Sequence, residues 1–180
     1  LCILGGGLTG LSLAKSLTKK GLSIDIFLNK KKSDLDRSRT IGISNDNLMY
    51  FNKEILDIKK LSWNIKKIEI YSDNLRNEKI LNFENDNKTV FAIIRNYQLQ
   101  SNLLKSLKKN KLCKFKQNFD YNLSNLKKYK LIINCENDNY FTKKFFARSL
   151  KKKYDSRAYT TILKHEKIQN LSLIHISEPT

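Results

Sequence analysis

The feature that most constrains the fold is a glycine-rich stretch near the start of the chain, Gly5-Gly6-Gly7-Leu8-Thr9-Gly10. It follows a short apolar run, residues 1–4, and precedes a segment whose apolar residues have helical spacing. In a strand–turn–helix unit, glycines at these three places permit a tight turn, close approach of a pyrophosphate, and close packing of helix on strand. The helix N-terminus then offers free N–H groups to the phosphates. The stretch therefore predicts a dinucleotide-binding turn that consists of Gly5, Gly7, Leu8, Thr9 and Gly10.

The residues that follow complete a βαβ pattern. One helical face carries the apolar and small residues Gly10, Leu13, Ala14 and Leu17. Gly21 stands where this helix would stop, and Ser23–Leu28 has the composition of a second buried strand. An Asp or Glu often follows such a strand and binds the cofactor ribose. Here Asn29 is the side chain at that end that can hydrogen-bond a ribose.

The composition narrows the class of protein. A formal net charge of +18 in 180 residues is compatible with nucleic-acid binding. The lysines are nevertheless spread along the whole chain, and runs such as Lys30–Lys32 lack interleaved aromatic residues, so we interpret them as solvated faces and expect no nucleic-acid partner. The three cysteines show no CxxC spacing and there are two histidines, which predicts reduced thiols and no metal site.

Membrane and export signals are absent from the sequence. No apolar run has the length of a membrane span, and the first residues lack the pattern of a signal peptide. We therefore expect a cytoplasmic protein. The excess of lysine favours weak attraction to anionic membranes, so peripheral contact with the inner face of a membrane is a further expectation.

The rest of the chain alternates strand and helix patterns. After a polar loop, residues 29–38, the run 39–44 predicts a strand, with Ser44 as the cap of a helix through Leu48 and Phe51. Three runs separated by Asn/Asp turns predict an antiparallel meander inserted into the parallel fold: 67–72, 80–83 and 89–94. Leu99, Leu103 and Leu107 predict an amphipathic helix. Further strands are predicted at 112–115, 129–133 and 157–164.

The two ends of the chain have unusual sequences. The chain starts inside an apolar run without methionine, and we expect its N-terminus to be incomplete. Residues 172–180 resemble the translation of a sequencing adapter. We therefore expect this tail to be non-native and leave it out of the functional interpretation.

Three further motifs match a known family. They are Ser38-Arg39-Thr40-Ile41-Gly42-Ile43-Ser44, Asn96-Tyr97-Gln98-Leu99 and Leu131-Ile132-Ile133-Asn134-Cys135-Glu136-Asn137. With the glycine stretch, they resemble the FAD-dependent aromatic hydroxylases of the para-hydroxybenzoate hydroxylase class, and most of all the ubiquinone-biosynthesis family of 2-octaprenyl-6-methoxyphenol hydroxylase. The resemblance implies that Arg39 and Asn96 contact the flavin. It also implies that Glu136 lies in the segment that contacts the pyrophosphate, where asparagines replace both family glycines.

The resemblance further implies a fold and an activity. Residues 1–171 would be the N-terminal part of a Rossmann-like α/β FAD-binding domain, with interleaved strands of a substrate domain. The second flavin motif, Gly-Asp, would lie beyond residue 170, so this fragment alone is expected to be inactive. NADPH or NADH would reduce the FAD, and the enzyme would hydroxylate a phenolic ubiquinone precursor with a lipid tail. Partner proteins of ubiquinone biosynthesis are expected as well, and no catalytic residue stands out.

Three other interpretations remain open. A degenerate Rossmann-like nucleotide-binding protein without hydroxylase activity would explain the missing acid near Asn29 and the asparagines at 134 and 137. An NAD-dependent dehydrogenase shares the first motif, but the predicted meander follows the second strand where a further βα unit is expected. A basic nucleic-acid-binding module ranks last, and steep salt dependence of DNA binding would favour it. Bound FAD would separate the hydroxylase from the degenerate protein.

Overall fold

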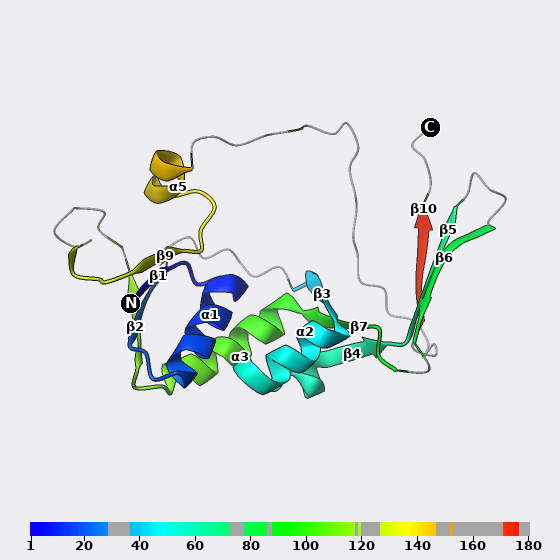
Figure 1. Ribbon diagram of the computed structural model, residues 1–180, viewed down its shortest axis with the longest axis horizontal. Coiled ribbons are helices and arrows are strands. Elements are labelled where there is room, and N and C mark those ends of the chain that lie inside the picture. The colour runs from blue at the N-terminus through cyan, green and yellow to red at the C-terminus, as the bar shows by residue number, and fades with distance from the viewer. Residues whose placement is uncertain are drawn as a thin grey trace.

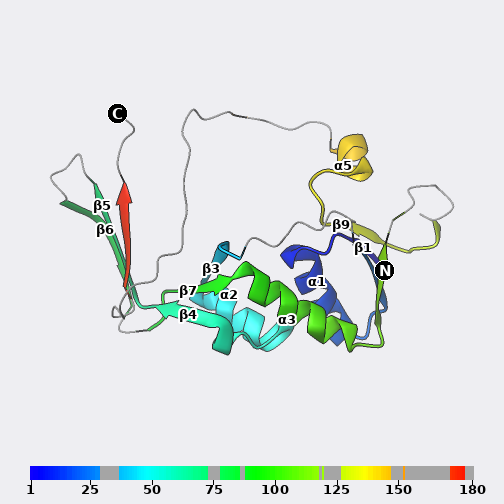
Figure 2. The same ribbon diagram turned by 180° about the vertical axis from the view of Figure 1, so that it is seen from behind.

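The computed structural model describes residues 1–28, 37–72, 78–85, 88–117, 119, 127–146, 152 and 171–176. The described residues form three small sheets that follow one another along the long axis of the molecule, with two long helices beside the first sheet (Figure 1). The N-terminus lies at the first sheet and the C-terminal strand at the last, as the view from behind also shows (Figure 2).

The first sheet is parallel throughout. It contains β1 (Cys2–Leu4), β2 (Ile24–Leu28), β8 (Cys113–Gln117) and β9 (Ile132–Asn134), in the order β8-β2-β1-β9. This is the strand order 3-2-1-4 with which a dinucleotide-binding fold begins. β1 and β9, far apart in the sequence, are neighbours, and the strand order reverses between them. In such sheets ligands bind outside the carboxyl ends of the strands at this point.

Helix α1 (Leu8–Lys19) connects β1 to β2, so the predicted βαβ unit is confirmed. Its end is fixed by Gly21, whose φ of 79° favours a residue without a Cβ. The Gly21 N–H donates to the carbonyl oxygen of Thr18 at 3.1 Å, and the Leu22 N–H donates to that of Leu17 at 3.2 Å. These paired bonds satisfy the last carbonyl groups of the helix, which is the Schellman arrangement.

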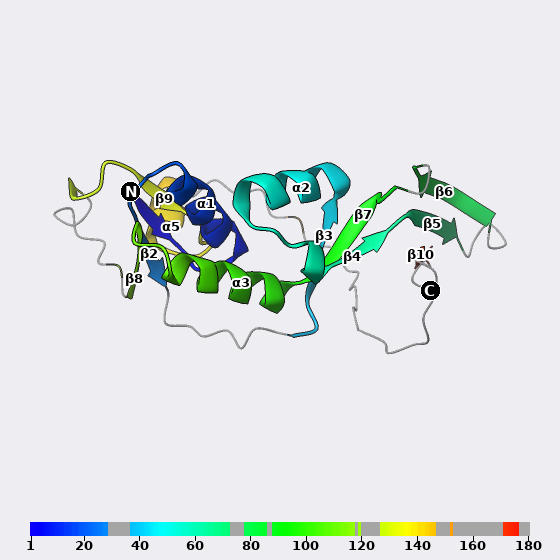
Figure 3. The same ribbon diagram turned by 90° about the horizontal axis from the view of Figure 1, so that it is seen from below.

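Helix α3 (Asn96–Lys108) packs beside α1 against the same face of the parallel sheet (Figure 3). The predicted apolar stripe is confirmed, because Leu99, Leu103 and Leu107 are all buried. Burial of three leucines stabilises the fold by several kcal/mol, at about 2 kcal/mol for each side chain. The core around them is continuous and includes Ile3, Leu11, Ala14, Ile24, Ile26, Leu48, Ile55, Ile58, Ala92, Ile94 and Cys113.

The second sheet is antiparallel and has β7 (Phe91–Arg95) in its centre, between β3 (Thr40–Ser44) and β4 (Ser62–Ile65). The third sheet contains β5 (Lys67–Ser72) and β6 (Glu78–Glu84), an antiparallel pair as predicted. The third strand of the predicted meander is wrong. That strand, β7, pairs with β3 and β4 in the second sheet and not with β5 or β6. Ala92 and Ile94 explain the difference, because both are buried in the common core, which the exposed β6 does not reach.

Short helices complete the described chain. Ser44 caps α2 (Asn45–Tyr50) as predicted, by accepting from the Asn47 N–H at 3.5 Å. A π-helical turn, η1 (Phe51–Ile55), and a 3-10 turn, η2 (Lys59–Leu61), follow. Helix α5 (Tyr140–Phe145), which the sequence did not predict, lies on the side of the parallel sheet away from α3 (Figure 1).

Several sequence predictions concern the last part of the chain. The predicted strand 157–164 lies outside the described residues. Strand β10 (Leu171–Ile176) runs parallel to β5, with Leu171 opposite Lys67. That the tail from residue 172 is non-native stays a prediction. In the described part of the chain, no helix combines the length and the apolar character needed to cross a bilayer.

Candidate functional site

The site lies where β1 and β9 end side by side. Gly5 follows β1 with a φ of 112°, a conformation that L side chains rarely adopt. A Cβ at Gly5 would lie 2.9 Å from Cγ of Glu136 and 3.1 Å from the carbonyl oxygen of Cys135. A glycine is therefore required at this turn for two independent reasons. The same contacts place Glu136 directly beside the turn.

The other two glycines have different surroundings. A Cβ at Gly10 would lie 2.2 Å from the carbonyl oxygen of Gly5, so only a glycine lets α1 approach the turn this closely. A Cβ at Gly7 would have no neighbouring atom within 4 Å in the part of the chain that the structure describes. The turn is thus packed at Gly5 and Gly10 and open at Gly7.

The N-terminus of α1 opens toward this free space. Gly7 is its N-cap residue and offers no side-chain hydrogen bond, and the first turn of the helix carries no acidic residue. Leu8 packs against the core while Thr9 is exposed. Backbone N–H groups at such an end lack partners within the helix and attract anions. The turn is therefore suited to a phosphate or pyrophosphate.

Helix α3 brings further polar groups to the turn. The Asn96 N–H donates to the carbonyl oxygen of Arg39 at 3.0 Å, and Oδ1 of Asn96 is buried with no hydrogen-bond partner among the described residues. One turn later, Nε2 of Gln100 donates to the carbonyl oxygen of Gly6 at 2.8 Å. The structure thus joins Arg39 and Asn96 through their backbones, and Gln100 links α3, the helix that begins at Asn96, to the glycine turn. Sequence analysis missed Gln100, although its spacing of four residues from Asn96 puts both on one helical face.

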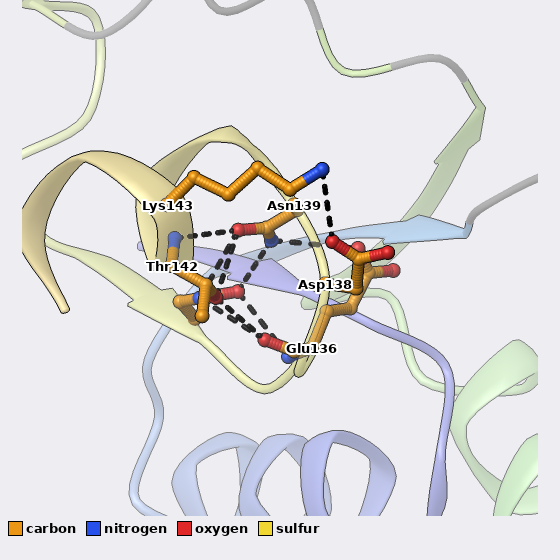
Figure 4. A network of polar contacts seen from close by, with 6 residues as sticks. Glu136, Asp138, Asn139, Thr142 and Lys143 are labelled. Atoms are coloured by element: carbon orange, nitrogen blue, oxygen red, sulfur yellow. Dashed lines mark hydrogen bonds and ion pairs between the residues drawn. The ribbon is translucent and has the colours of Figure 1, made fainter. Parts of the chain in front are cut away.

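The loop after β9 is organised by side chains (Figure 4). Oδ1 of Asn134 accepts from the Glu136 N–H at 3.2 Å and from Nδ2 of Asn139 at 2.6 Å. Oγ1 of Thr142 donates to the carbonyl oxygen of Glu136 at 3.0 Å, and Oδ1 of Asn139 caps α5 by accepting from the Thr142 N–H at 3.0 Å. Side-chain amides therefore shape the segment in which the resembling family has glycines. The spacing Asn139-x-x-Thr142, typical of a helix cap, was the signal for this network.

Asn29, which follows β2, and Asp25, near the start of β2, bear on the expected ribose contact. Asn29 lies outside the described residues. Asp25, inside β2, accepts hydrogen bonds from Nζ of Lys116 and from the Tyr129 hydroxyl, the latter at 2.7 Å. Burial raises the pKa of Asp25, but the hydrogen bonds from Lys116 and Tyr129 outweigh it and leave the pKa below its ordinary value. Asp25 is thus engaged within the sheet.

The cysteines are neutral thiols. Burial raises the pKa of both Cys2 and Cys113 to about 11, and burial also raises that of Cys135. A thiol with so high a pKa is a poor nucleophile and metal ligand. Among the described residues, no group of three or more His, Cys, Asp or Glu side chains is placed to hold a metal ion.

The structure has a pocket away from the glycine turn. It has a volume of about 390 Å³ and is lined by residues of α2 and β6, among them Asp46 and Phe83. It is separate from the glycines, Asn96 and Glu136. The glycine turn suits a dinucleotide better, because open space at Gly7 and an uncapped helix N-terminus coincide there.

Comparison with known proteins supports the fold. No protein-family model and no curated protein sequence matches the chain. Among solved structures, pqsL, a probable FAD-dependent monooxygenase from Pseudomonas aeruginosa, matches with a TM-score of 0.62 and 11% identity over 85% of this chain and 47% of that chain. The p-nitrophenol 4-monooxygenase PnpA from Pseudomonas putida DLL-E4 matches with a TM-score of 0.54 and 17% identity over 65% of this chain and 31% of that chain.

The chain therefore has the mixed α/β fold, with a parallel sheet, that FAD-dependent monooxygenases share. It spans less than half the length of either structure. The fold class predicted from the sequence is confirmed at this level. The cofactor contacts predicted for individual residues stay predictions.

Proposed function

We propose that the chain is part of an FAD-dependent monooxygenase and that it binds the FAD pyrophosphate at the glycine turn. The observation that carries the proposal is the open, uncapped start of α1 at Gly7, at the carboxyl edge of a parallel sheet ordered 3-2-1-4. Bound FAD would supply the redox chemistry of oxygen transfer. The protein would bind and orient it and exclude water.

Five of the predicted site residues would contact the cofactor directly. Backbone N–H groups of Gly7, Leu8 and Thr9 would bind the phosphates, since an anion is stabilised at a helix N-terminus. Oδ1 of Asn96, buried and unpaired within the described residues, would accept from a hydroxyl of the cofactor. Arg39 is exposed, with its backbone bound to that of Asn96, and would contact the flavin.

The proposal extends to the substrate and the reductant. The motif resemblance favours a phenolic ubiquinone precursor with a lipid tail, with NADPH or NADH as reductant and with contact to a membrane and to partner proteins of that pathway. The name of one structural neighbour, p-nitrophenol 4-monooxygenase, likewise points to a phenol. Because this chain spans less than half of its neighbours, we propose hydroxylation as the activity of a longer protein.

A second candidate is a Rossmann-like protein that has lost its flavin. The observation that favours it is the side-chain network after β9. There the Glu136 N–H, which would otherwise be free for a ligand, already donates to Asn134. A protein of this kind would keep the fold and bind no FAD.

Titration of FAD into the purified protein, followed by the change in flavin fluorescence, decides between the two candidates. We expect saturable binding, and we expect Gly7→Ala to weaken it at least about tenfold, because the added methyl group fills the space that the phosphates need. The φ of −74° at Gly7 accepts alanine without strain. Lys20→Ala, a change to the same residue at an exposed position at the other end of α1, is the control. Absence of FAD binding by the unsubstituted protein would favour the second candidate.

A further inference from the structure

Gln100 is the side chain that holds the glycine turn from the side of α3. Its Nε2 donates to the carbonyl oxygen of Gly6 at 2.8 Å, between residues 94 positions apart in the chain. The helix that carries it is fixed to the core by Leu99 and Leu103, both buried. The Gln100 amide therefore reaches the turn from a rigid support.

The bond constrains more than one atom of the turn. The Gly6–Gly7 peptide is planar and trans, so its carbonyl group and its N–H group point in opposite directions. When Gln100 holds the Gly6 carbonyl toward α3, the Gly7 N–H is directed away from α3. Glycines on both sides of a peptide leave its plane free to rotate unless another group fixes it. The Gln100 bond is such a restraint.

The surroundings of Gly6 and Gly7 differ in a way that fits this restraint. A Cβ at Gly6 would lie 2.3 Å from Cδ2 of Leu28, so β2 closes the turn on that side. A Cβ at Gly7 would meet no atom within 4 Å, so space remains for a ligand there. The peptide between them joins the packed half of the turn to its open half.

We propose that Gln100 is a positioning residue for FAD: it fixes the Gly6–Gly7 peptide plane so that the Gly7 N–H is oriented to bind the pyrophosphate. This inference rests on the proposed function. Gln100 acts through the backbone, and its effect on FAD is indirect. A preorganised donor loses less entropy on binding than one that must first be ordered, so the restraint increases affinity.

Two substitutions at Gln100 test the proposal. Gln100→Leu keeps the helix and removes the donor, and we expect the dissociation constant for FAD to rise about tenfold, the effect of roughly one hydrogen bond. Gln98→Leu is the matched control on the same helix, and we expect it to bind FAD like the unsubstituted protein. Thermal unfolding of each apoprotein, followed by circular dichroism, reports whether the fold is retained.

Gln100→Glu gives a readout that a purely structural contact would not. An ionised carboxylate cannot donate to the Gly6 carbonyl, whereas a protonated carboxyl group can. Since an ordinary glutamate has a pKa of about 4.3, we expect this variant to bind FAD weakly at pH 8 and to approach the unsubstituted protein as the pH falls toward 4.5. The affinity at each pH is expressed relative to that of the unsubstituted protein, which removes the titration of other groups.

The outcomes separate this inference from the function on which it rests. If the unsubstituted protein binds FAD and Gln100→Leu binds it equally well, the role of Gln100 is refuted while the proposed function stands. A Gln100→Glu variant whose relative affinity is independent of pH also refutes it, even if Gln100→Leu fails to fold. If the unsubstituted protein does not bind FAD, both proposals fall together.

Discussion

The two ends of the molecule are built on different principles. At the parallel-sheet end, all three residues of β1 are buried, and Gly5 and Gly10 fit closely against backbone atoms. At the other end, each of the seven residues of β6 is exposed. There β5 and β6 are joined by polar contacts, in which Glu69 pairs with both Lys67 and Lys79. The comparison teaches that steric fit defines the candidate site, whereas charge pairing dominates the distant hairpin.

Loss of a core side chain should show the largest difference between the two ends. Leu103 is fully buried and Phe83 is 47% exposed. We expect Leu103→Ala to lower the free energy of unfolding by about 3 kcal/mol, because it removes buried apolar surface and leaves a cavity. Phe83→Ala, although it removes a larger side chain, should cost less than about 1 kcal/mol. Urea denaturation of both variants measures the contrast, and equal losses would contradict it.

Substitution of a closely packed glycine in the glycine turn should give the next largest loss of stability. We expect Gly10→Ala to lower the free energy of unfolding by about 2 kcal/mol, because the new methyl group would meet the Gly5 carbonyl oxygen, a backbone atom that cannot move aside. Gly7→Ala adds the same group in open space and should leave the free energy of unfolding within about 0.5 kcal/mol of the original. The same denaturation measurement compares them. A destabilised Gly7→Ala protein would show that the turn is closed at Gly7.

Loss of the ion pair between Asp25 and Lys116, on the parallel sheet, should have a smaller effect on the free energy of unfolding. We expect Lys116→Met to lower the free energy of unfolding by about 1 kcal/mol, a figure reduced for the partial exposure of this lysine. The folded-state pKa of Asp25 lies below its ordinary 3.8, so its contribution is fully present above pH 3.8 and is lost as the pH falls through the folded-state pKa. In Lys116→Met, stability should therefore fall less steeply with acid than in the original protein. Denaturation at several values of pH below 5 tests this.

The smallest effect concerns Glu69 in the hairpin of β5 and β6. Substitution of its partner Lys79 should change mainly the pKa of Glu69. Hydrogen bonds from Lys79 first and then from Lys67 lower the pKa of Glu69 from 4.5 to about 2. Its contribution to stability is present above pH 4.5 and is lost as the pH falls toward 2. We expect Lys79→Gln to raise this pKa toward its ordinary value, and NMR titration of the Glu69 side chain measures the shift. Lys88→Gln, which removes the same charge elsewhere, should leave it unchanged.

Local patterns predicted much of the fold. The stop of α1 at Gly21, the buried stripe of α3 and the cap at Ser44 each depend on residues a few positions apart, and each is confirmed. The pairing of β7 was predicted wrongly, because alternation of apolar residues shows that a strand is buried on one face without showing which strands flank it. Its partners were decided by Ala92 and Ile94 and the core available to them.

The candidate site was predictable to a similar degree. The glycine turn was evident in the sequence because its spacing is dictated by backbone geometry within six residues. Gln100 was not, because its partner Gly6 lies 94 residues away. Glu136 and the turn come together only through the pairing of β1 with β9, which was not predicted. The family resemblance implied only that the segment of Glu136 contacts the pyrophosphate. Contacts between segments far apart in the sequence produce no periodic pattern of residues. Analysis of local patterns therefore does not find them.

The pairing of β1 with β9 also determines the order in which the protein can fold. Cys2 lies opposite Ile132, about 130 residues later in the chain, and closing so long a loop slows folding. During synthesis, β1 and α1 leave the ribosome before β9 and can pack with β2 while β9 is still to be made. The glycine turn is therefore made well before the segment after β9 that lies beside it. A ligand whose binding site includes residues next to both β1 and β9 can bind only after these two strands have paired.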